Sequence, residues 1–179
     1  MYVNPRTPAL LLAALLGLSQ CKKNSPAPEE QLPPATQTGA NTLGCLVNGQ
    51  PWTPQGNDGS SNYRIVYDRA LGGAFDLRTY RYQQKPTDNY QYMILFATRL
   101  YAPKSYSFRD SLNTEAYISD RLTGCELTSR DKTTYRRGTL TITRLDLQAG
   151  IISGTFDFVL AKPGCDTVRV TQGRFDKRL

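Results

Sequence analysis

The cysteine at position 21 is the residue whose surroundings most clearly specify a chemical reaction. It follows Leu18-Ser19-Gln20 and an apolar run from Ala9 to Leu18, which is preceded by a single basic residue, Arg6. A short charged start, about ten apolar residues and a cysteine are the layout of a bacterial lipoprotein signal. Such a run is too short to cross a bilayer, which needs about 20 apolar residues. We therefore predict that residues 1–20 are removed and that Cys21 becomes the lipid-modified first residue of an exported protein.

Two other interpretations of this N-terminus stay open, because Gln20 is an unusual neighbour for a lipid-modified cysteine. An ordinary signal peptidase could cut after Ser19, with small residues at Gly17 and Ser19, and release a soluble secreted protein. Alternatively, Cys21 is an unmodified thiol. If Cys21 is acylated, its chains hold the protein to a membrane, since two or more acyl chains give stable anchoring.

Three further cysteines, Cys45, Cys125 and Cys165, indicate one disulfide bond in an exported chain. Three pairings are possible, and one thiol is left over. We favour Cys125 with Cys165, since both are expected at the starts of strands in the C-terminal half. The chain contains no Cys-x-x-Cys spacing, so neither a redox motif nor a zinc site is predicted.

Histidine is absent from the chain, and this excludes the commonest catalytic arrangements. Neither a Ser-His-Asp nor a Cys-His nucleophile can form, and most zinc enzymes use imidazole ligands. Catalysis would then depend on carboxylates, for example a pair that cleaves glycosides. Asp76, Glu115 and Asp157 are the candidates, but no spacing singles out two of them. We therefore expect no catalytic residue, metal or cofactor, with a carboxylate-dependent glycan hydrolase as the alternative.

Four tyrosines on two neighbouring runs of the chain form the candidate binding face. If the runs pair as a hairpin with Tyr80 opposite Tyr92 and Tyr82 opposite Tyr90, the four rings form an outward ladder beside Arg78. Aromatic faces next to hydrogen-bonding groups suit sugar rings, peptides or small apolar ligands. Cross-strand tyrosines also stabilise sheets, so a purely structural role is the alternative.

Two features near the start of the folded part have structural interpretations. Residues 56–62 are rich in oxygen-bearing side chains that could surround calcium, but they include one carboxylate, Asp58, and lack the EF-hand order. We interpret them as a flexible loop. Trp52 is expected to close one end of the core.

The elements that position these residues are expected to be strands. Short runs with a period of two recur between turn-forming residues, and no stretch has the i, i+3, i+4, i+7 spacing of an amphipathic helix. The expected strands include residues 63–67, 74–83, 90–99, 139–146, 151–160 and 167–177. The pattern predicts an all-β antiparallel sandwich or barrel of about eight to ten short strands.

The last expected strand changes the side on which its apolar residues lie. Val168 and Val170 share one face, whereas Phe175 has the opposite parity. A strict period of two would expose one of these sets. We therefore expect a β-bulge near Gly173, because glycine tolerates the backbone conformation that a bulge needs.

The chain divides into three parts by composition. After the signal at residues 1–20, residues 21–43 contain the candidate lipidated cysteine and a polar, Pro-rich stretch that is expected to be a disordered tether. Residues 44–179 have the size of one all-β domain. The net charge of +7 is consistent with an ordinary solvated surface or with attraction to anionic lipid, lipopolysaccharide or acidic glycan. Nucleic acid is not expected, since the basic residues are scattered.

Several segments resemble a group of uncharacterised Bacteroidetes-type lipoproteins. They are Cys-Leu-Val-Asn-Gly-Gln-Pro-Trp at 45–52 and the segments at 138–146, 152–158 and 171–176. The resemblance implies one all-β domain behind a lipid anchor, and it carries no activity and no catalytic or ligand-binding residues. Members displayed on the cell surface tend to have acidic residues soon after the cysteine, whereas Lys22 and Lys23 follow Cys21 here.

These observations together predict a lipoprotein anchored in the outer membrane, on its periplasmic side rather than on the cell surface. We expect a non-catalytic binding or envelope-associated module. Its partners would be the membrane, through the lipid, and a glycan, a peptide or a small apolar ligand.

Overall fold

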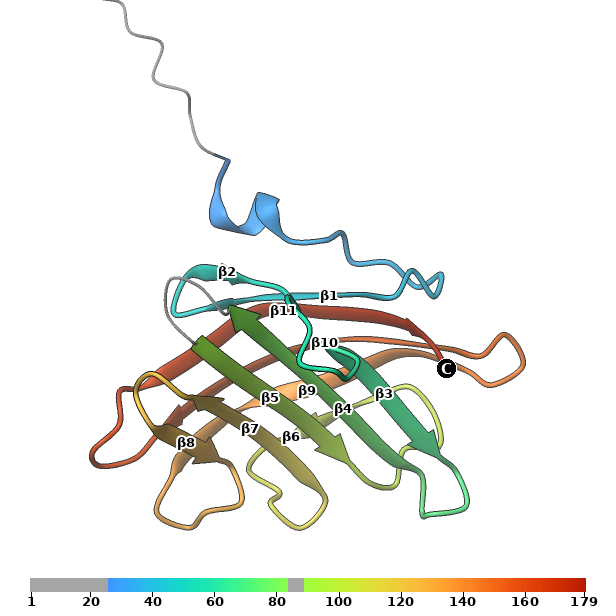
Figure 1. Ribbon diagram of the computed structural model, residues 1–179. Helices are drawn as coiled ribbons and strands as arrows, with labels where there is room; N and C mark the ends of the chain where they lie inside the picture. The colour runs from blue at the N-terminus through green and yellow to red at the C-terminus, as the bar shows by residue number, and fades with distance from the viewer. Residues whose placement is uncertain (1–25, 84–88) are drawn as a thin grey trace, which may run out of the picture.

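Two antiparallel β-sheets packed face to face make up the protein, as seen in a computed structural model that describes residues 26–83 and 89–179 (Figure 1). The six-stranded sheet has the order β2-β1-β11-β10-β9-β6, and the five-stranded sheet has the order β3-β4-β5-β7-β8. The prediction of an all-β fold is confirmed, and of the two architectures it is the sandwich. The signal at residues 1–20 and Cys21 lie outside the described residues.

The described residues form eleven strands and one short 3₁₀ helix. These are η1 (Pro28–Gln31), β1 (Thr42–Val47), β2 (Gln50–Trp52), β3 (Tyr63–Asp68), β4 (Ala74–Gln83), β5 (Asn89–Ala97), β6 (Lys104–Ser107), β7 (Thr114–Asp120), β8 (Cys125–Thr128), β9 (Tyr135–Asp146), β10 (Ile151–Ala161) and β11 (Val168–Arg178). The count exceeds the expected eight to ten because β2, β6 and β8 have only three or four residues each. Strands this short are too brief to show a period of two in the sequence.

Alternate residues of each long strand supply the core between the sheets. In β10, Phe156 and Phe158 are buried, whereas Thr155 and Asp157 on the opposite face are exposed. Cys45 of β1 is fully buried and is the free cysteine of the described residues. Burial raises the pKa of its thiol to about 12, so Cys45 stays protonated inside the core.

A β-bulge interrupts β11 at the predicted place. Phe156 and Phe158 of β10 are two residues apart, but their partners Gly173 and Val170 are three apart, so β11 carries one extra residue. The left-handed backbone belongs to Gln172, with φ of 55°. Gly173 is required for another reason, because a Cβ there would lie 2.5 Å from the ring of Phe156. The bulge allows apolar residues on both sides of it to face the core.

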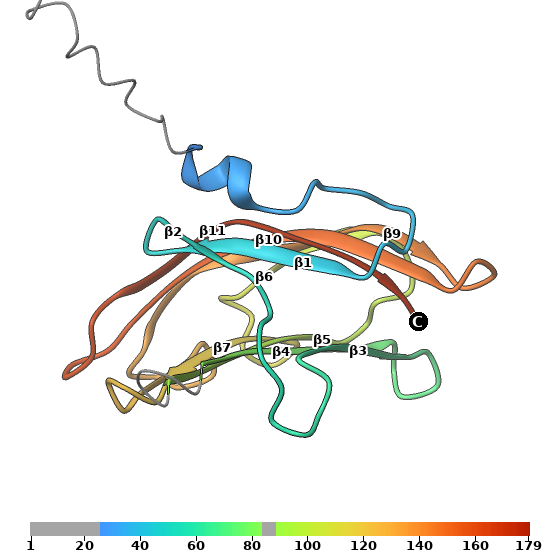
Figure 2. The ribbon, with the colours of Figure 1, turned by 45° about the horizontal axis from the view of Figure 1, so that its top comes forward.

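Residues 26–41 lie against the outer face of the six-stranded sheet, opposite the layer that the five-stranded sheet forms (Figure 2). Leu32 is only 8% exposed, and Gly44 of β1 lies so close to Pro33 that a Cβ would come within 2.6 Å of its ring. The prediction of a disordered tether up to residue 43 is therefore corrected. Its remaining part, residues 21–25, lies outside the described residues.

A single carboxylate, that of Asp176 in β11, holds this N-terminal segment. Asp176 is 1% exposed and accepts five hydrogen bonds of 2.7–3.0 Å. The donors are the backbone N–H groups of Thr38, Gly39 and Ala40 and the hydroxyls of Thr36 and Ser153. Burial by itself would raise the pKa of Asp176, but these hydrogen bonds outweigh it and hold the pKa well below its usual range.

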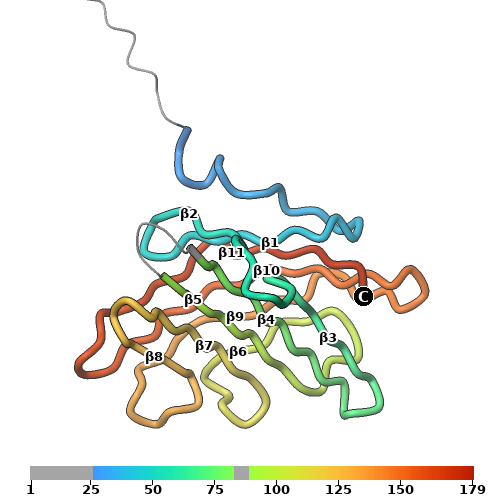
Figure 3. Tube along the Cα trace, in the orientation of Figure 1, coloured from blue at the N-terminus to red at the C-terminus, as the bar shows by residue number. Residues whose placement is uncertain are grey.

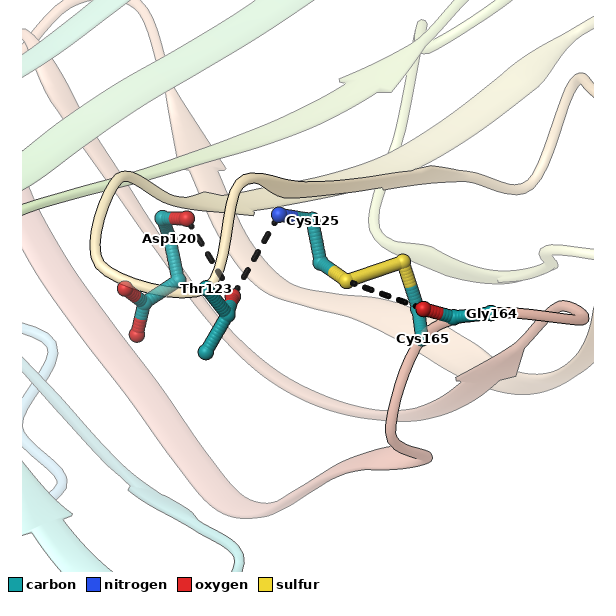
Figure 4. Close-up of a disulfide and its surroundings, with 5 residues drawn as sticks. All are labelled: Asp120, Thr123, Cys125, Gly164 and Cys165. Carbon is teal, nitrogen blue, oxygen red and sulfur yellow. Dashed lines mark hydrogen bonds between the residues drawn. A yellow bond between two sulfur atoms is a disulfide. The ribbon is translucent and has the colours of Figure 1, made fainter.

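The disulfide between Cys125 and Cys165 connects the two sheets (Figure 4). Cys125 begins β8 of the five-stranded sheet, and Cys165 lies in the loop between β10 and β11 of the other sheet. This is the pairing that the sequence favoured. Within the described part of the chain, no helix has the length and apolar character needed to span a membrane.

Candidate functional site

The four tyrosines of the candidate face lie in the register that the sequence predicts. Tyr80 of β4 is opposite Tyr92 of β5, and Tyr82 is opposite Tyr90. Their side chains alternate with core residues such as Leu77 and therefore lie on the outer face of the five-stranded sheet. The Tyr90 ring stacks with the rings of Tyr80 and Tyr92, with centroids 5.4 and 6.3 Å apart.

Tyr80 is covered, which corrects the prediction of four outward-facing rings. It is only 2% exposed, because residues 55–62 fold over it. Its hydroxyl accepts a hydrogen bond from the Asp58 N–H at 3.1 Å and donates one to the Ser60 carbonyl at 2.7 Å. Tyr80 thus supports the loop, and the half-buried rings of Tyr90 and Tyr92 lie nearest the solvent beside it.

The connection from β2 to β3, which crosses from one sheet to the other, is held to the edge of β4 rather than being a flexible loop (Figure 3). The Gln55 N–H donates to the Tyr80 carbonyl, and the Tyr82 N–H donates to the Gln55 carbonyl. Gly56 follows with φ of 79°, and a Cβ there would lie 2.2 Å from the Tyr82 carbonyl oxygen. Only glycine at position 56 allows the loop to come this close to the strand.

Asp58, the one carboxylate of the oxygen-rich loop, is engaged within the protein. It accepts hydrogen bonds from the hydroxyl and N–H of Ser60 and from the hydroxyl of Tyr90. These bonds, the Ser60 hydroxyl first, lower the pKa of Asp58 to about 2, although desolvation opposes the shift. Burial and the Asp58 carboxylate raise the pKa of Tyr90 to about 12, so its hydroxyl is intact at neutral pH. No cluster of three or more potential metal ligands occurs in residues 26–83 and 89–179.

A groove of about 810 Å³ runs across this face of the sheet. Arg64 and Arg78 line its end near β3, Tyr90 and Tyr92 line its middle, and Glu126 of β8 lines its other end. We call this feature the tyrosine groove. Its loop wall, which contains Ser60 and Ser61, is fixed by the hydrogen bonds to Tyr80. Tyr82 lies outside the groove, in a shallower neighbouring hollow.

Arg78, the predicted cation of the face, is held in place by a carboxylate on its own strand. Its Nε and Nη2 atoms donate to Asp76 at 2.9–3.1 Å, and Asp76 raises the pKa of Arg78 above its usual value. The Arg78 side chain is still 47% exposed. The guanidinium is therefore both oriented and accessible to a ligand.

The three carboxylates proposed for a hydrolase are not brought together. Asp76 and Glu115 each form an ion pair with an arginine, and Asp157 lies on the outer face of the other sheet. Of the residues that the structure describes, the carboxylates lining the tyrosine groove are instead Asp120 and Glu126. The sequence did not single them out.

A second cavity, of about 780 Å³, opens between the sheets at the end of the sandwich where the disulfide lies. Trp52 donates from Nε1 to Gln91 at 2.9 Å, and Gln91 donates to Asp120 at 2.6 Å. Trp52 is 2% exposed, so it closes this end of the core, as expected, and its ring faces are not available to a ligand. The sequence could not reveal this cavity, because its lining comes from five separate stretches of the chain, at residues 47–52, 81, 91, 118–127 and 164–168.

The sequence also missed Arg64 as part of the candidate site. The alternation of Tyr63, Arg64 and Ile65 indicates that Arg64 lies on the polar face of its strand. The pattern does not say which strand is its neighbour. Only the pairing of β3 with β4 places Arg64 beside Arg78 and the tyrosines.

Comparisons with known proteins add no relative from which a role could be transferred. No protein-family model matches this chain, and neither a curated protein nor a solved structure matches it. The likeness to Bacteroidetes-type lipoproteins therefore stays a resemblance of sequence segments.

Proposed function

We propose that this chain is a lipid-anchored, non-catalytic binding module of the bacterial cell envelope and that the tyrosine groove holds its ligand. The observation that carries this proposal is a groove of about 810 Å³ in which the rings of Tyr90 and Tyr92 lie between arginines and Glu126. Ligand sites commonly combine a hollow of roughly 300–1,000 Å³ with aromatic side chains and a few placed polar groups. The groove has each of these properties.

The shape of the groove is fixed before any ligand arrives. Its loop wall is fastened through Tyr80, Gln55 and Asp58, and Arg78 is oriented by Asp76. A ligand would not have to order these groups, so less binding energy would be lost in ordering the site. A purely structural tyrosine ladder would need the ring contacts but not a walled hollow beside them.

The groove is tested by removing one ring and measuring ligand binding with the mature chain. We expect a glycan and small-molecule array to identify a ligand whose affinity falls at least tenfold in Tyr92→Ala. Tyr135→Ala is the matched control, because Tyr135 is an exposed tyrosine on β9 of the other sheet. A Tyr92→Ala protein with a native circular dichroism spectrum and unchanged binding would contradict the proposal.

Membrane attachment is tested separately, with a clickable fatty acid fed to cells that produce the full chain. We propose that Cys21 carries the label and that the protein fractionates with the outer membrane, on its periplasmic side. Cys21→Ala should lose the label and leave the membrane fraction, whereas Cys45→Ala should keep both. A Cys21→Ala protein that stays membrane-bound would refute the anchor.

Hydrolysis is the alternative function, and the same preparation distinguishes it from binding. A binding module leaves its glycan intact after long incubation. The appearance of new reducing ends that is abolished in Glu126→Gln would instead establish a carboxylate-dependent hydrolase.

A further inference from the structure

Two arginines face each other across neighbouring strands at one end of the tyrosine groove. Arg64 of β3 is directly opposite Arg78 of β4, which places their Cα atoms about 4.5–5.5 Å apart. Like charges directly opposite each other destabilise a sheet. Arg78 has Asp76 as its ion-pair partner, whereas the side chain of Arg64 forms no hydrogen bond or ion pair with the described part of the chain. One positive charge at this end of the groove is thus uncompensated.

An anionic group placed between the two guanidinium groups would remove this repulsion. Guanidinium groups present planar pairs of N–H donors that match the oxygens of a carboxylate, sulfate or phosphate. Both side chains are accessible from solvent, since Arg64 is exposed and Arg78 is half-exposed. The arginine pair therefore favours a ligand with one negative charge at this end.

The surface beside the arginine pair is aromatic, since Tyr90 and Tyr92 line the groove there. Tyr92 lies one row further along the sheet than Arg78, and its ring is within 16° of parallel to that of Tyr90. Aromatic side chains that line a groove suit the apolar face of a sugar ring. A peptide is less well suited, because peptides usually add to the edge of a sheet through their main chain, and this groove crosses the face of central strands. A bilayer surface would not enter a walled groove.

The opposite end of the groove carries two carboxylates, Asp120 and Glu126, beside one arginine, Arg121. Glu126 is opposite Ser119, which is opposite Tyr92, so Glu126 lies in the same row two strands away. Glu126 is exposed and lines the groove. A uniformly acidic polymer would meet a like charge there, whereas the hydroxyls of a neutral sugar can donate hydrogen bonds to this carboxylate.

We infer, on the basis of the proposed function of this groove, that its ligand is an acidic glycan in which one carboxylated sugar is followed by a neutral one. The carboxylate lies between Arg64 and Arg78, the sugar ring stacks on Tyr92, and the neutral sugar extends towards Glu126. The arginines thus select for charge, and the tyrosines supply a contact that neutral and acidic sugars share.

The test uses a panel of oligosaccharides that each carry one uronic acid, together with the carboxyl-reduced form of each. Binding to the mature chain is measured by isothermal titration calorimetry at low and high salt. We expect at least one acidic member to bind, its reduced form to bind at least tenfold more weakly, and added salt to weaken the acidic member only. Arg64→Gln should lose about tenfold in affinity for the acidic member and none for the neutral form.

Arg137→Gln is the matched control, because Arg137 is an exposed arginine on β9 of the other sheet, and the change removes the same charge. It should leave binding unchanged. Thermal denaturation gives a second measurement on Arg64→Gln. Since the substitution removes a like-charge pair, the variant should melt no lower than the unmodified protein, and lost binding then cannot be ascribed to unfolding.

The possible failures separate the ligand class from the proposed function. If neutral forms bind as well as acidic ones, and Tyr92→Ala abolishes both, the groove is a binding site but the acidic glycan is wrong. Binding of anionic vesicles or acidic peptides in place of every glycan would also overturn the ligand class. If no ligand responds to either Tyr92→Ala or Arg64→Gln, both the inference and the proposed function fail.

Discussion

Asp176 shows how one residue can order a segment far away in sequence. Its partners in the N-terminal segment precede it by 136–140 residues, and no apolar pattern in that segment indicates that it packs. A buried carboxylate is tolerated only when hydrogen bonds replace the water that it loses. Thr38, Gly39 and Ala40 supply three such bonds from consecutive backbone N–H groups.

The stability of the protein should therefore depend on the ionisation of Asp176. Its pKa is lower in the folded state than the value of about 3.9 in an unfolded chain, so its contribution is fully present above about pH 4 and is lost as the pH falls below it. We expect Asp176→Asn to lower the free energy of unfolding by about 2–3 kcal/mol at pH 7 and by much less at pH 2. Urea denaturation from pH 2 to 7 measures this difference. Asp157→Asn, an exposed change on the same sheet, is the control and should leave the pH dependence of the free energy of unfolding unaltered. If this pH dependence has the same shape in Asp176→Asn as in the unmodified protein, Asp176 is not the group that causes it.

Loss of the hydroxyl group should lower the stability of the protein strongly at Tyr80 and only slightly at Tyr82. Tyr80→Phe leaves the Asp58 N–H and the Ser60 carbonyl without their partner, so we expect a loss of about 1–3 kcal/mol in the free energy of unfolding. The Tyr82 hydroxyl has no hydrogen bond to a described residue, and Tyr82→Phe should change stability by less than about 0.5 kcal/mol. Chemical denaturation compares the two variants. Hydrogen exchange should also be faster at residues 56–62 in Tyr80→Phe alone.

Individual elements differ in how far the sequence could predict them. The pairing of β4 with β5 was predictable, because both strands alternate regularly over nine or more residues and one register brings their apolar faces together. The bulge in β11 was predictable from the change of parity between Val170 and Phe175. The order of residues 26–41 was not, since it depends on Asp176 rather than on any local pattern. Arg64 and Glu126 were missed at the site for the same kind of reason, because strand order is a long-range property.

Gly173 and Gln172 contribute to the bulge in β11 for different reasons. Gly173→Ala would place a Cβ against the ring and the carbonyl of Phe156, and we expect a loss of about 1–3 kcal/mol in stability. Gln172→Gly should change stability by less than about 0.5 kcal/mol, because relief of its left-handed backbone offsets the greater freedom of the unfolded chain. Thermal and urea denaturation of both variants test the pair. A larger loss in Gln172→Gly than in Gly173→Ala would show that the bulge is misassigned.

At the scale of the whole molecule, the disulfide holds the two sheets together in addition to the hydrophobic core between them. The disulfide closes a loop with a sequence separation of 40 residues. A cross-link of this span restricts the unfolded chain and is expected to contribute about 2–4 kcal/mol. The double variant Cys125→Ser, Cys165→Ser should lose this amount of stability in urea denaturation, and reductant should then have no further effect on it.

Cys45 should resist thiol reagents in both the unmodified protein and the double variant until the protein unfolds, since it is buried and protonated.

The N-terminal segment also determines how the domain would respond to tension. Because residues 26–41 cross the outer face of the six-stranded sheet, a pull on the N-terminus would act first on the hydrogen bonds of Asp176 and then along the ladder between β1 and β11. The five-stranded sheet forms the other layer, on the side of the six-stranded sheet away from residues 26–41 (Figure 2). Tension between an attached N-terminus and a ligand in the tyrosine groove would cross both sheets, and the hydrogen bonds of Asp176 to residues 36–40 would be among the first contacts that it loads.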